Sequence, residues 1–149
     1  MTIQELRPDM HIEGKCHCGN ITYGLHWPGE GTNIPVRACS CSFCTKHGGT
    51  YTSHRDAELA AVVHDQALVS RYMFGTETAE FFLCSRCGVV LFVTSMIEGN
   101  LNAVVNVNSF EGIDPACFLR AVTDFDGETT ESRLDRRKRN WIPSVTVTS

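Results

Sequence analysis

Three short cysteine motifs constrain the fold of this chain more than any other feature of its sequence. They hold seven of the eight cysteines and read Cys16-x-Cys18, Cys39-x-Cys41-x-x-Cys44 and Cys84-x-x-Cys87. Zinc prefers four tetrahedral ligands, with thiolate sulfurs at about 2.3 Å, and a closed site usually takes two such motifs from separate chain segments. The motifs therefore predict a protein that folds around two zinc ions.

The amino-terminal sequence and the net charge indicate the compartment and the kinds of partner to expect for this protein. Residues 1–14 carry three acidic side chains and lack the apolar run of a secretory signal. No stretch approaches the ~20 apolar residues of a membrane helix. We expect a reducing, cytoplasmic environment, where cysteines serve as metal ligands and not as disulfides. The net charge of −4 disfavours nucleic acid as a partner, and no membrane is expected.

The first and last motifs share one turn chemistry. Glycine follows both Cys18 and Cys87, and a glycine there lets the backbone fold back so that its N–H groups point at buried thiolates. Cys16, Cys18, Cys84 and Cys87 are therefore predicted to form one closed zinc site. Such a site would staple two segments that lie far apart in the sequence.

The middle motif supplies only three ligands, which are Cys39, Cys41 and Cys44. A coordination position left to water or to a substrate atom distinguishes catalytic zinc from structural zinc, so this motif predicts a catalytic centre suited to thiol chemistry. The alternative is a second closed site that His47 or Cys117 completes. Otherwise His47 faces solvent or shuttles a proton, and Cys117 packs as a small apolar side chain.

The rest of the chain has the patterning of a mainly β fold in one domain, as expected for 149 residues. Apolar residues alternate with polar ones over 21–27, which is typical of a half-buried strand. Residues 67–74 and 79–83 flank a turn cluster and predict a hairpin. Residues 89–93 and 101–107 predict a second antiparallel pair.

Three shorter segments are less regular. Residues 28–35 hold several glycines and prolines and predict a surface loop. The paired glycines that end the segment 45–49 predict a turn around the middle motif. The pattern over 56–63 suits either a short helix or a strand, and we favour a strand.

The carboxyl-terminal third is predicted to leave the sheets. Asp114 followed by Pro115 is a typical helix start, so one short helix is expected over 114–121. After that helix the sequence turns polar and includes the basic run Arg136–Arg139. We expect a zinc-binding β domain over 1–125 and a polar, partly mobile tail over 126–149. The basic run is interpreted as solvated, with an acidic or nucleic-acid partner as the alternative.

The order and spacing of the motifs resemble a known family. The segments that carry the resemblance are Gly14-x-Cys16-x-Cys18-Gly19, Cys39-x-Cys41-x-x-Cys44-x-Lys46 and Phe82-x-Cys84-x-x-Cys87-Gly88. Over residues 12–108 they resemble the glutathione-dependent formaldehyde-activating enzymes. The resemblance implies a β-tent fold of zinc-stapled antiparallel sheets, with the four-cysteine set structural and the three-cysteine set catalytic. It also implies carbon–sulfur lyase chemistry, in which glutathione and formaldehyde give S-hydroxymethylglutathione.

The predicted function is therefore a zinc-dependent enzyme that joins glutathione, or another thiol, to formaldehyde or a small aldehyde. Lys46 and His47 lie two and three residues after the catalytic motif and are the candidate binding residues for the thiol cofactor. Further candidate cations are Arg55, Arg71 and Arg86. Because the family includes a centromere-associated branch, the alternative is a non-catalytic zinc module that binds a protein or nucleic acid. The sequence leaves the oligomeric state open.

Overall fold

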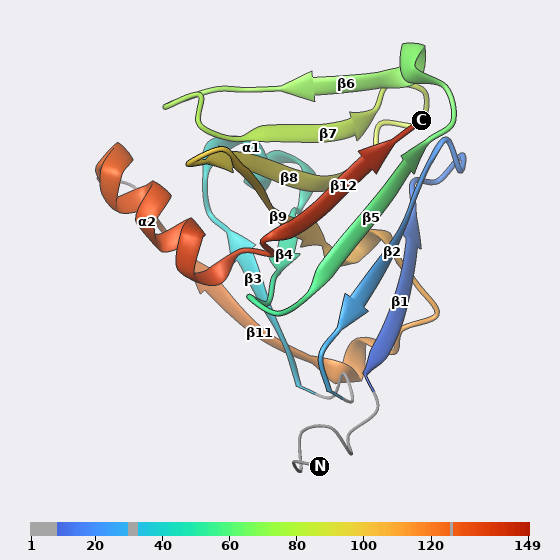
Figure 1. Ribbon diagram of the computed structural model, residues 1–149, viewed down its shortest axis with the longest axis horizontal. Helices are drawn as coiled ribbons and strands as arrows, with labels where there is room; N and C mark the ends of the chain where they lie inside the picture. The colour runs from blue at the N-terminus through green and yellow to red at the C-terminus, as the bar shows by residue number, and fades with distance from the viewer. Residues whose placement is uncertain (1–8, 30–32, 126) are drawn as a thin grey trace.

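Two β-sheets make up most of the fold (Figure 1). The computed structural model describes residues 9–29, 33–125 and 127–149. The five-stranded sheet has the order β10-β1-β2-β5-β12, and the seven-stranded sheet has the order β11-β3-β4-β9-β8-β7-β6. The first sheet consists of β10 (Phe110–Glu111), β1 (Met10–Lys15), β2 (Ile21–Trp27), β5 (Glu58–Val63) and β12 (Ser144–Thr148). The second consists of β11 (Phe118–Thr123), β3 (Ile34–Cys39), β4 (Thr50–Thr52), β9 (Asn100–Asn106), β8 (Val90–Ile97), β7 (Glu80–Cys84) and β6 (Val69–Tyr72).

The main core is built from side chains of both sheets. In β2 the residues Ile21, Tyr23 and Leu25 are buried and their neighbours are more exposed, because successive side chains of a strand point to opposite faces. Phe92 of β8 is fully buried and stacks on Phe82 of β7 at 4.7 Å between ring centroids. The core thus joins the strands that carry the first and the last cysteine motifs.

The mainly β architecture expected from the sequence is confirmed. The strand over 21–27, the strand within 56–63, the β6–β7 hairpin and the β8–β9 pair are all present, and both predicted pairs are antiparallel. The sheets are nevertheless mixed, since β11 runs parallel to β3 and β12 runs parallel to β5. Parallel partners come from distant parts of the sequence, and local patterning does not reveal them.

Three local predictions need correction. The helix expected over 114–121 is a single 3-10 turn, Pro115–Cys117, whose Asp114 side chain accepts the Ala116 N–H at 2.9 Å. The chain then continues as strand β11, because Phe118–Thr123 finds an edge partner in β3. The turn after the middle motif is a short helix, α1 (Ser42–His47), which ends at Gly48 with φ 71°. Of the predicted loop 28–35, residues 30–32 lie outside the described residues, and β3 already begins at Ile34.

The described part of the segment predicted as a polar tail, 126–149, contains a helix and a strand. Helix α2 (Thr130–Asn140) begins with the Thr129 side chain accepting the Ser132 N–H, and it lies beside β8 (Figure 1). The following Ile142 is fully buried and exchanges two backbone hydrogen bonds with Ala103 of β9, at 3.0 and 2.9 Å. Strand β12 then joins the five-stranded sheet. The polar sequence of this segment therefore covers one side of the fold instead of extending into solvent.

The described part of the chain contains no helix whose length and apolar character would allow it to cross a membrane. Besides α1 and α2, the described helical segments are three single 3-10 turns, η2 (Gln66–Leu68), η3 (Val107–Ser109) and η4 (Pro115–Cys117).

Candidate metal centre

The first and last cysteine motifs meet in space, as the sequence predicts. Cys16, Cys18, Cys84 and Cys87 place their sulfur atoms within 4.8 Å of one another. The motifs follow β1 and β7, and both turns end at a glycine with positive φ, which is 83° at one and 80° at the other. A residue with a Cβ rarely adopts this backbone conformation, so the turns depend on glycine.

The spacing of these sulfur atoms fits one tetrahedral metal ion. Cys16 Sγ lies 3.8 Å from Cys18 Sγ, and Cys18 Sγ lies 3.5 Å from Cys84 Sγ. Two thiolates on one zinc ion are about 3.8 Å apart when each Zn–S bond is about 2.3 Å. The Ile21 N–H also points at Cys16 Sγ at 3.4 Å, which helps to hold a thiolate. The four residues can therefore hold a metal ion as a complete ligand set.

The middle motif forms a second cluster, in which the sulfur atoms of Cys39, Cys41 and Cys44 lie within 4.8 Å of one another. Cys39 ends β3, Cys41 is the N-cap of α1, and Cys44 lies inside that helix. The Cys41 side chain accepts the Cys44 N–H at 3.3 Å. The first turn of α1 thus brings the three sulfur atoms to one point.

The electrostatics of this second cluster favour a mixed thiol and thiolate state. The Cys44 thiol donates toward the Cys39 sulfur, and this contact lowers the pKa of Cys39 to about 5. The same contact, together with burial, raises the pKa of Cys44. The Tyr51 hydroxyl lies 3.4 Å from Cys44 Sγ. Burial and the contact with Cys44 raise the pKa of Tyr51, so this hydroxyl remains a proton donor at neutral pH. Cys39 is therefore more easily ionised than Cys44 in this cluster.

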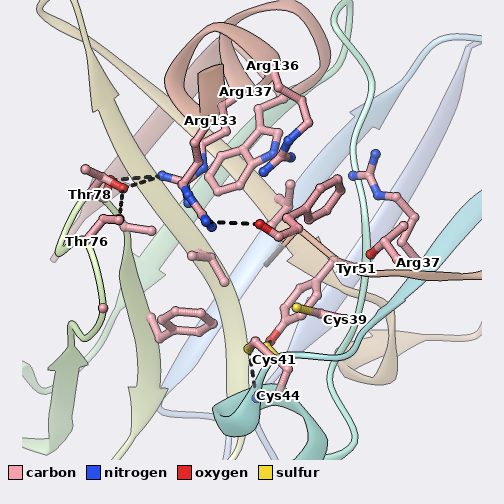
Figure 2. Close-up of a pocket in the computed structure, with 18 of the residues that line it drawn as sticks. Arg37, Cys39, Cys41, Cys44, Tyr51, Thr76, Thr78, Arg133, Arg136 and Arg137 are labelled. Carbon is pink, nitrogen blue, oxygen red and sulfur yellow. Dashed lines mark hydrogen bonds between the residues drawn. The ribbon is translucent and has the colours of Figure 1, made fainter. Parts of the chain in front are cut away.

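The three-cysteine cluster opens into a cavity of about 260 Å³, shown in Figure 2. The four-cysteine residues are not among those that line it. One wall is apolar and is formed by Phe74, Phe81, Val93, Val104 and Trp141. A cavity with apolar walls and a few convergent polar groups is the usual form of a small-molecule site. A small molecule in the cavity would therefore contact the three-cysteine cluster and not the four-cysteine cluster.

Four arginines line the same cavity. Figure 2 shows Arg133, Arg136 and Arg137 on α2 and Arg37 on β3. Arg136 makes a two-point ion pair with Glu128, at 3.0 and 3.1 Å. Its guanidinium also lies over the ring of Phe125, 3.6 Å from the centroid. Because Arg136 is fixed in this way, its position at the cavity is set before any ligand binds.

The guanidinium groups of Arg137 and Arg37 are held by neutral oxygens. Arg137 is 6% exposed and donates to Thr78 Oγ1 at 2.9 Å and to Ser95 Oγ at 3.3 Å. Burial, with the positive charges of Arg136 and Arg133, lowers the pKa of Arg137 to about 10. Arg37 donates to Ser53 Oγ at 2.9 Å. Each of these side chains therefore keeps its positive charge at neutral pH.

Several residues singled out from the sequence lie apart from this cavity. Lys46 and His47 are exposed on α1 and do not line it. The His47 ring packs on Phe43, with centroids 4.7 Å apart, and His47 is not part of the described three-cysteine group. Cys117 is half-buried in η4 and belongs to neither described cluster. The exposed cations Arg55, Arg71 and Arg86 do not line the cavity either.

The four arginines that line the cavity are not among the site residues that the sequence predicts. The run Arg136–Arg139 was interpreted as solvated because charged residues adjoin it. A signal was nevertheless present, since Trp141 and Ile142 follow the run after a single asparagine, and Val145 and Val147 alternate with polar residues. Apolar residues in that pattern indicate a segment that packs on the core.

The fold and the two clusters define a class of protein, a mainly β protein with two cysteine clusters that could each hold a metal ion, one of them at an accessible cavity. Within that class, the chain belongs to the family of glutathione-dependent formaldehyde-activating enzymes, whose pattern it matches over residues 11–118. A Halomonas elongata protein that carries the name of this family is 33% identical over 91 residues. That segment covers 56% of this chain and 56% of the relative, so the chain spans little more than half of the relative's length.

A solved structure supports the same relationship. The crystal structure of a Rhodobacter sphaeroides protein is similar to this one with a TM-score of 0.55 and 29% sequence identity. The similarity covers 69% of this chain and 91% of the other. The family match ends at Phe118, so α2 and the three of its arginines that line the cavity lie beyond it.

Proposed function

We propose that this protein is a zinc-dependent enzyme that adds a thiol to formaldehyde or another small aldehyde, as an S-hydroxymethylglutathione synthase does. Glutathione is the leading candidate thiol, and the activity would be that of a carbon–sulfur lyase. The family membership and the accessible three-cysteine cluster support this proposal. We also propose a cytoplasmic setting, since the eight cysteines are free thiols that a reducing environment would preserve.

The single observation that carries the proposal is the difference between the two clusters. The four-cysteine cluster has a complete ligand set, whereas the three-cysteine cluster supplies three ligands and borders the cavity. A zinc ion held there would supply Lewis acidity and a free coordination position for an incoming sulfur. We assign a structural role to the first cluster and a catalytic role to Cys39, Cys41 and Cys44.

The reaction balances without any oxidant or reductant. The thiol sulfur forms a bond to the aldehyde carbon, the carbonyl π bond breaks, and the proton lost by the thiol ends on the new hydroxyl oxygen. The protein's part is to hold the two reactants together in the cavity, which replaces a bimolecular encounter by an oriented one. The apolar wall around Phe81 and Val93 excludes water from the reacting atoms.

The experiment is a titration of the cobalt-substituted protein with glutathione, followed by visible spectroscopy. Thiolate-to-cobalt bands report the number and identity of the ligands. We expect one band to grow and saturate as glutathione is added, and Cys41→Ser to abolish that change. The product of a reaction with ¹³C-formaldehyde is then identified by NMR as the S-hydroxymethyl adduct.

An unchanged spectrum with two fully loaded sites would contradict the proposal. The second centre would then be closed, and the protein would act as a non-catalytic metal module that binds a partner. The matched control is Cys117→Ser, which changes a thiol that belongs to neither described cluster. This variant should show the same spectral change as the unmodified protein.

A further inference from the structure

One side of the cavity has a positive charge that the proposed reaction does not use. Four guanidinium groups line it, from Arg37, Arg133, Arg136 and Arg137. The carboxylates at this side are Asp124 in the lining and Glu128, which pairs with Arg136. This leaves an excess of two positive charges. A zinc ion with three thiolates at the other side would carry a formal charge of −1, so the cavity would stay positive.

We infer that these arginines form an anion subsite that binds a carboxylate of the substrate, so that the substrate is an acidic thiol. This inference rests on the proposed function and specifies its substrate class. Guanidinium groups bind carboxylates through two parallel hydrogen bonds, which are among the strongest hydrogen bonds in proteins. The thiol end of the same molecule would point toward the three-cysteine cluster, on the opposite side of the cavity in Figure 2.

The burial of the arginines favours a bound anion. The Nε atoms of Arg133 and Arg137 are buried, and neither has a hydrogen-bond partner in the part of the chain that the structure describes. Leaving a buried donor unpaired, above all on a charged group, is costly. Arg37 and Arg136 lie close enough for the positive charge of Arg136 to lower the pKa of Arg37, after the larger effect of burial. A carboxylate placed among these guanidinium groups would offset their mutual repulsion.

The arginines are also positioned by contacts that do not need the ligand. Glu128 and Phe125 fix Arg136, and Thr78 and Ser95 fix Arg137. Ser53, which accepts from Arg37, itself donates to the Asn140 carbonyl at the end of α2 at 2.9 Å. Arg37 and α2 are thus linked through one hydroxyl. Such preorganisation reduces the entropy lost when an anion binds.

Most of the subsite lies outside the segment that matches the family, which includes only Arg37 of the four arginines. Three of the four arginines lie on α2, and the family match ends before that helix. The candidate metal ligands and the three arginines of α2 therefore come from different parts of the sequence, whereas Arg37 lies on the same strand as Cys39. The preference for an acidic thiol can differ between relatives that share the same cysteine motifs.

The test uses ligands that separate charge from thiol chemistry. S-methylglutathione keeps both carboxylates but has no free thiol. Its diethyl ester has neither a free carboxylate nor a free thiol. We expect isothermal titration of the zinc-loaded protein to show about 10- to 100-fold tighter binding of the acid than of the ester, the range for charge-assisted hydrogen bonds. Binding of the acid should also weaken as salt is raised.

Two variants locate the subsite on the protein. Arg136→Gln and Arg37→Gln should each weaken binding of S-methylglutathione about 10-fold or more and reduce the difference between acid and ester. The matched control is Arg139→Gln on the same helix, whose side chain is 68% exposed and does not line the cavity. It should bind like the unmodified protein, and circular dichroism checks that all three variants are folded.

Equal affinity for the acid and the ester, or no binding of the acid at millimolar concentration, would overturn the inference. Unmodified affinity in both Arg136→Gln and Arg37→Gln would overturn it as well. The proposed function would survive either result if glutathione still changed the cobalt spectrum. Conversely, acid-selective binding with an unchanged cobalt spectrum would keep the subsite and remove the thiol chemistry.

Discussion

The phenol oxygen of Tyr51 lies 3.4 Å from Cys44 Sγ and links strand β4 to the three-cysteine cluster. Tyr51 is buried, and its raised pKa keeps the hydroxyl protonated. A neutral hydroxyl that donates to a thiolate stabilises the charged form and fixes the direction of the sulfur lone pairs. Tyr51 is therefore a positioning residue for this cluster and not a ligand.

Tyr51→Phe should lower the metal affinity of the three-cysteine cluster by about 10-fold, the lower end of the range for such supporting contacts. The four-cysteine cluster should be unaffected. Competition of the cobalt-substituted protein with a chelator measures both affinities. Tyr23→Phe is the matched control, since its hydroxyl bonds to Ser109 at 2.6 Å, apart from both clusters. Equal metal affinity in Tyr51→Phe and the unmodified protein would exclude the positioning role.

Gly49→Ala should affect the same cluster by a different route. A Cβ at Gly49 would lie 2.5 Å from the Tyr51 hydroxyl oxygen and 2.8 Å from a carbon of the His47 ring. Because Tyr51 is buried, it has little room to move without leaving Cys44. We expect this variant to lose metal from the three-cysteine cluster, as Tyr51→Phe does, and chelator competition reveals the loss. Combining the two changes should add little, because both break one contact.

The cysteine partition could be predicted because it depends on short-range spacing. The three sulfur atoms of the middle motif come from six consecutive residues, and the turn glycines after Cys18 and Cys87 mark the paired motifs. The antiparallel strands were predictable for a similar reason, since alternation over 21–27 is a local pattern.

The arginine side of the cavity could not be predicted in this way. The position of α2 depends on two long-range strand pairings, the parallel pairing of β11 with β3 and that of β12 with β5. Together these pairings bring α2 beside β8. A charged helix has no sequence feature that distinguishes a solvated surface from the wall of a polar cavity. The distinction lies in neighbours such as Thr78 and Ser95, which are more than 40 residues away from Arg137.

Cys18→Ser and Cys41→Ser should separate stability from thiol binding. Each should bind one zinc ion instead of two. Cys18→Ser should lose at least about 3 kcal/mol, or about 6–12 °C in Tm, because its cluster joins turns 66 residues apart. The three-cysteine cluster joins residues that are close in the sequence, so Cys41→Ser should lose less stability. It should, however, abolish the change in the cobalt spectrum on addition of glutathione. Metal analysis, calorimetry and the cobalt titration check the pair. A larger Tm loss in Cys41→Ser would reverse the proposed roles.

Phe92→Ala should destabilise the fold by about 3–5 kcal/mol, as expected when a large core side chain is removed. Phe92 is fully buried, stacks on Phe82 and meets the Tyr23 ring edge-on at 6.5 Å between centroids. Urea unfolding of the zinc-loaded protein measures the loss. Val122→Ala, at a residue that is 78% exposed, is the control and should change stability by less than about 0.5 kcal/mol.

The order of the two functional parts along the chain has a consequence for biosynthesis. The last candidate metal ligand, Cys87, precedes the first residue of α2, Thr130, by 43 residues. At a translation rate of about 5–20 residues per second, about 2 to 9 seconds separate their emergence. A nascent chain therefore presents all seven candidate ligand cysteines before the three cavity arginines of α2 have been synthesised, so metal could be acquired co-translationally, before the proposed substrate site is complete.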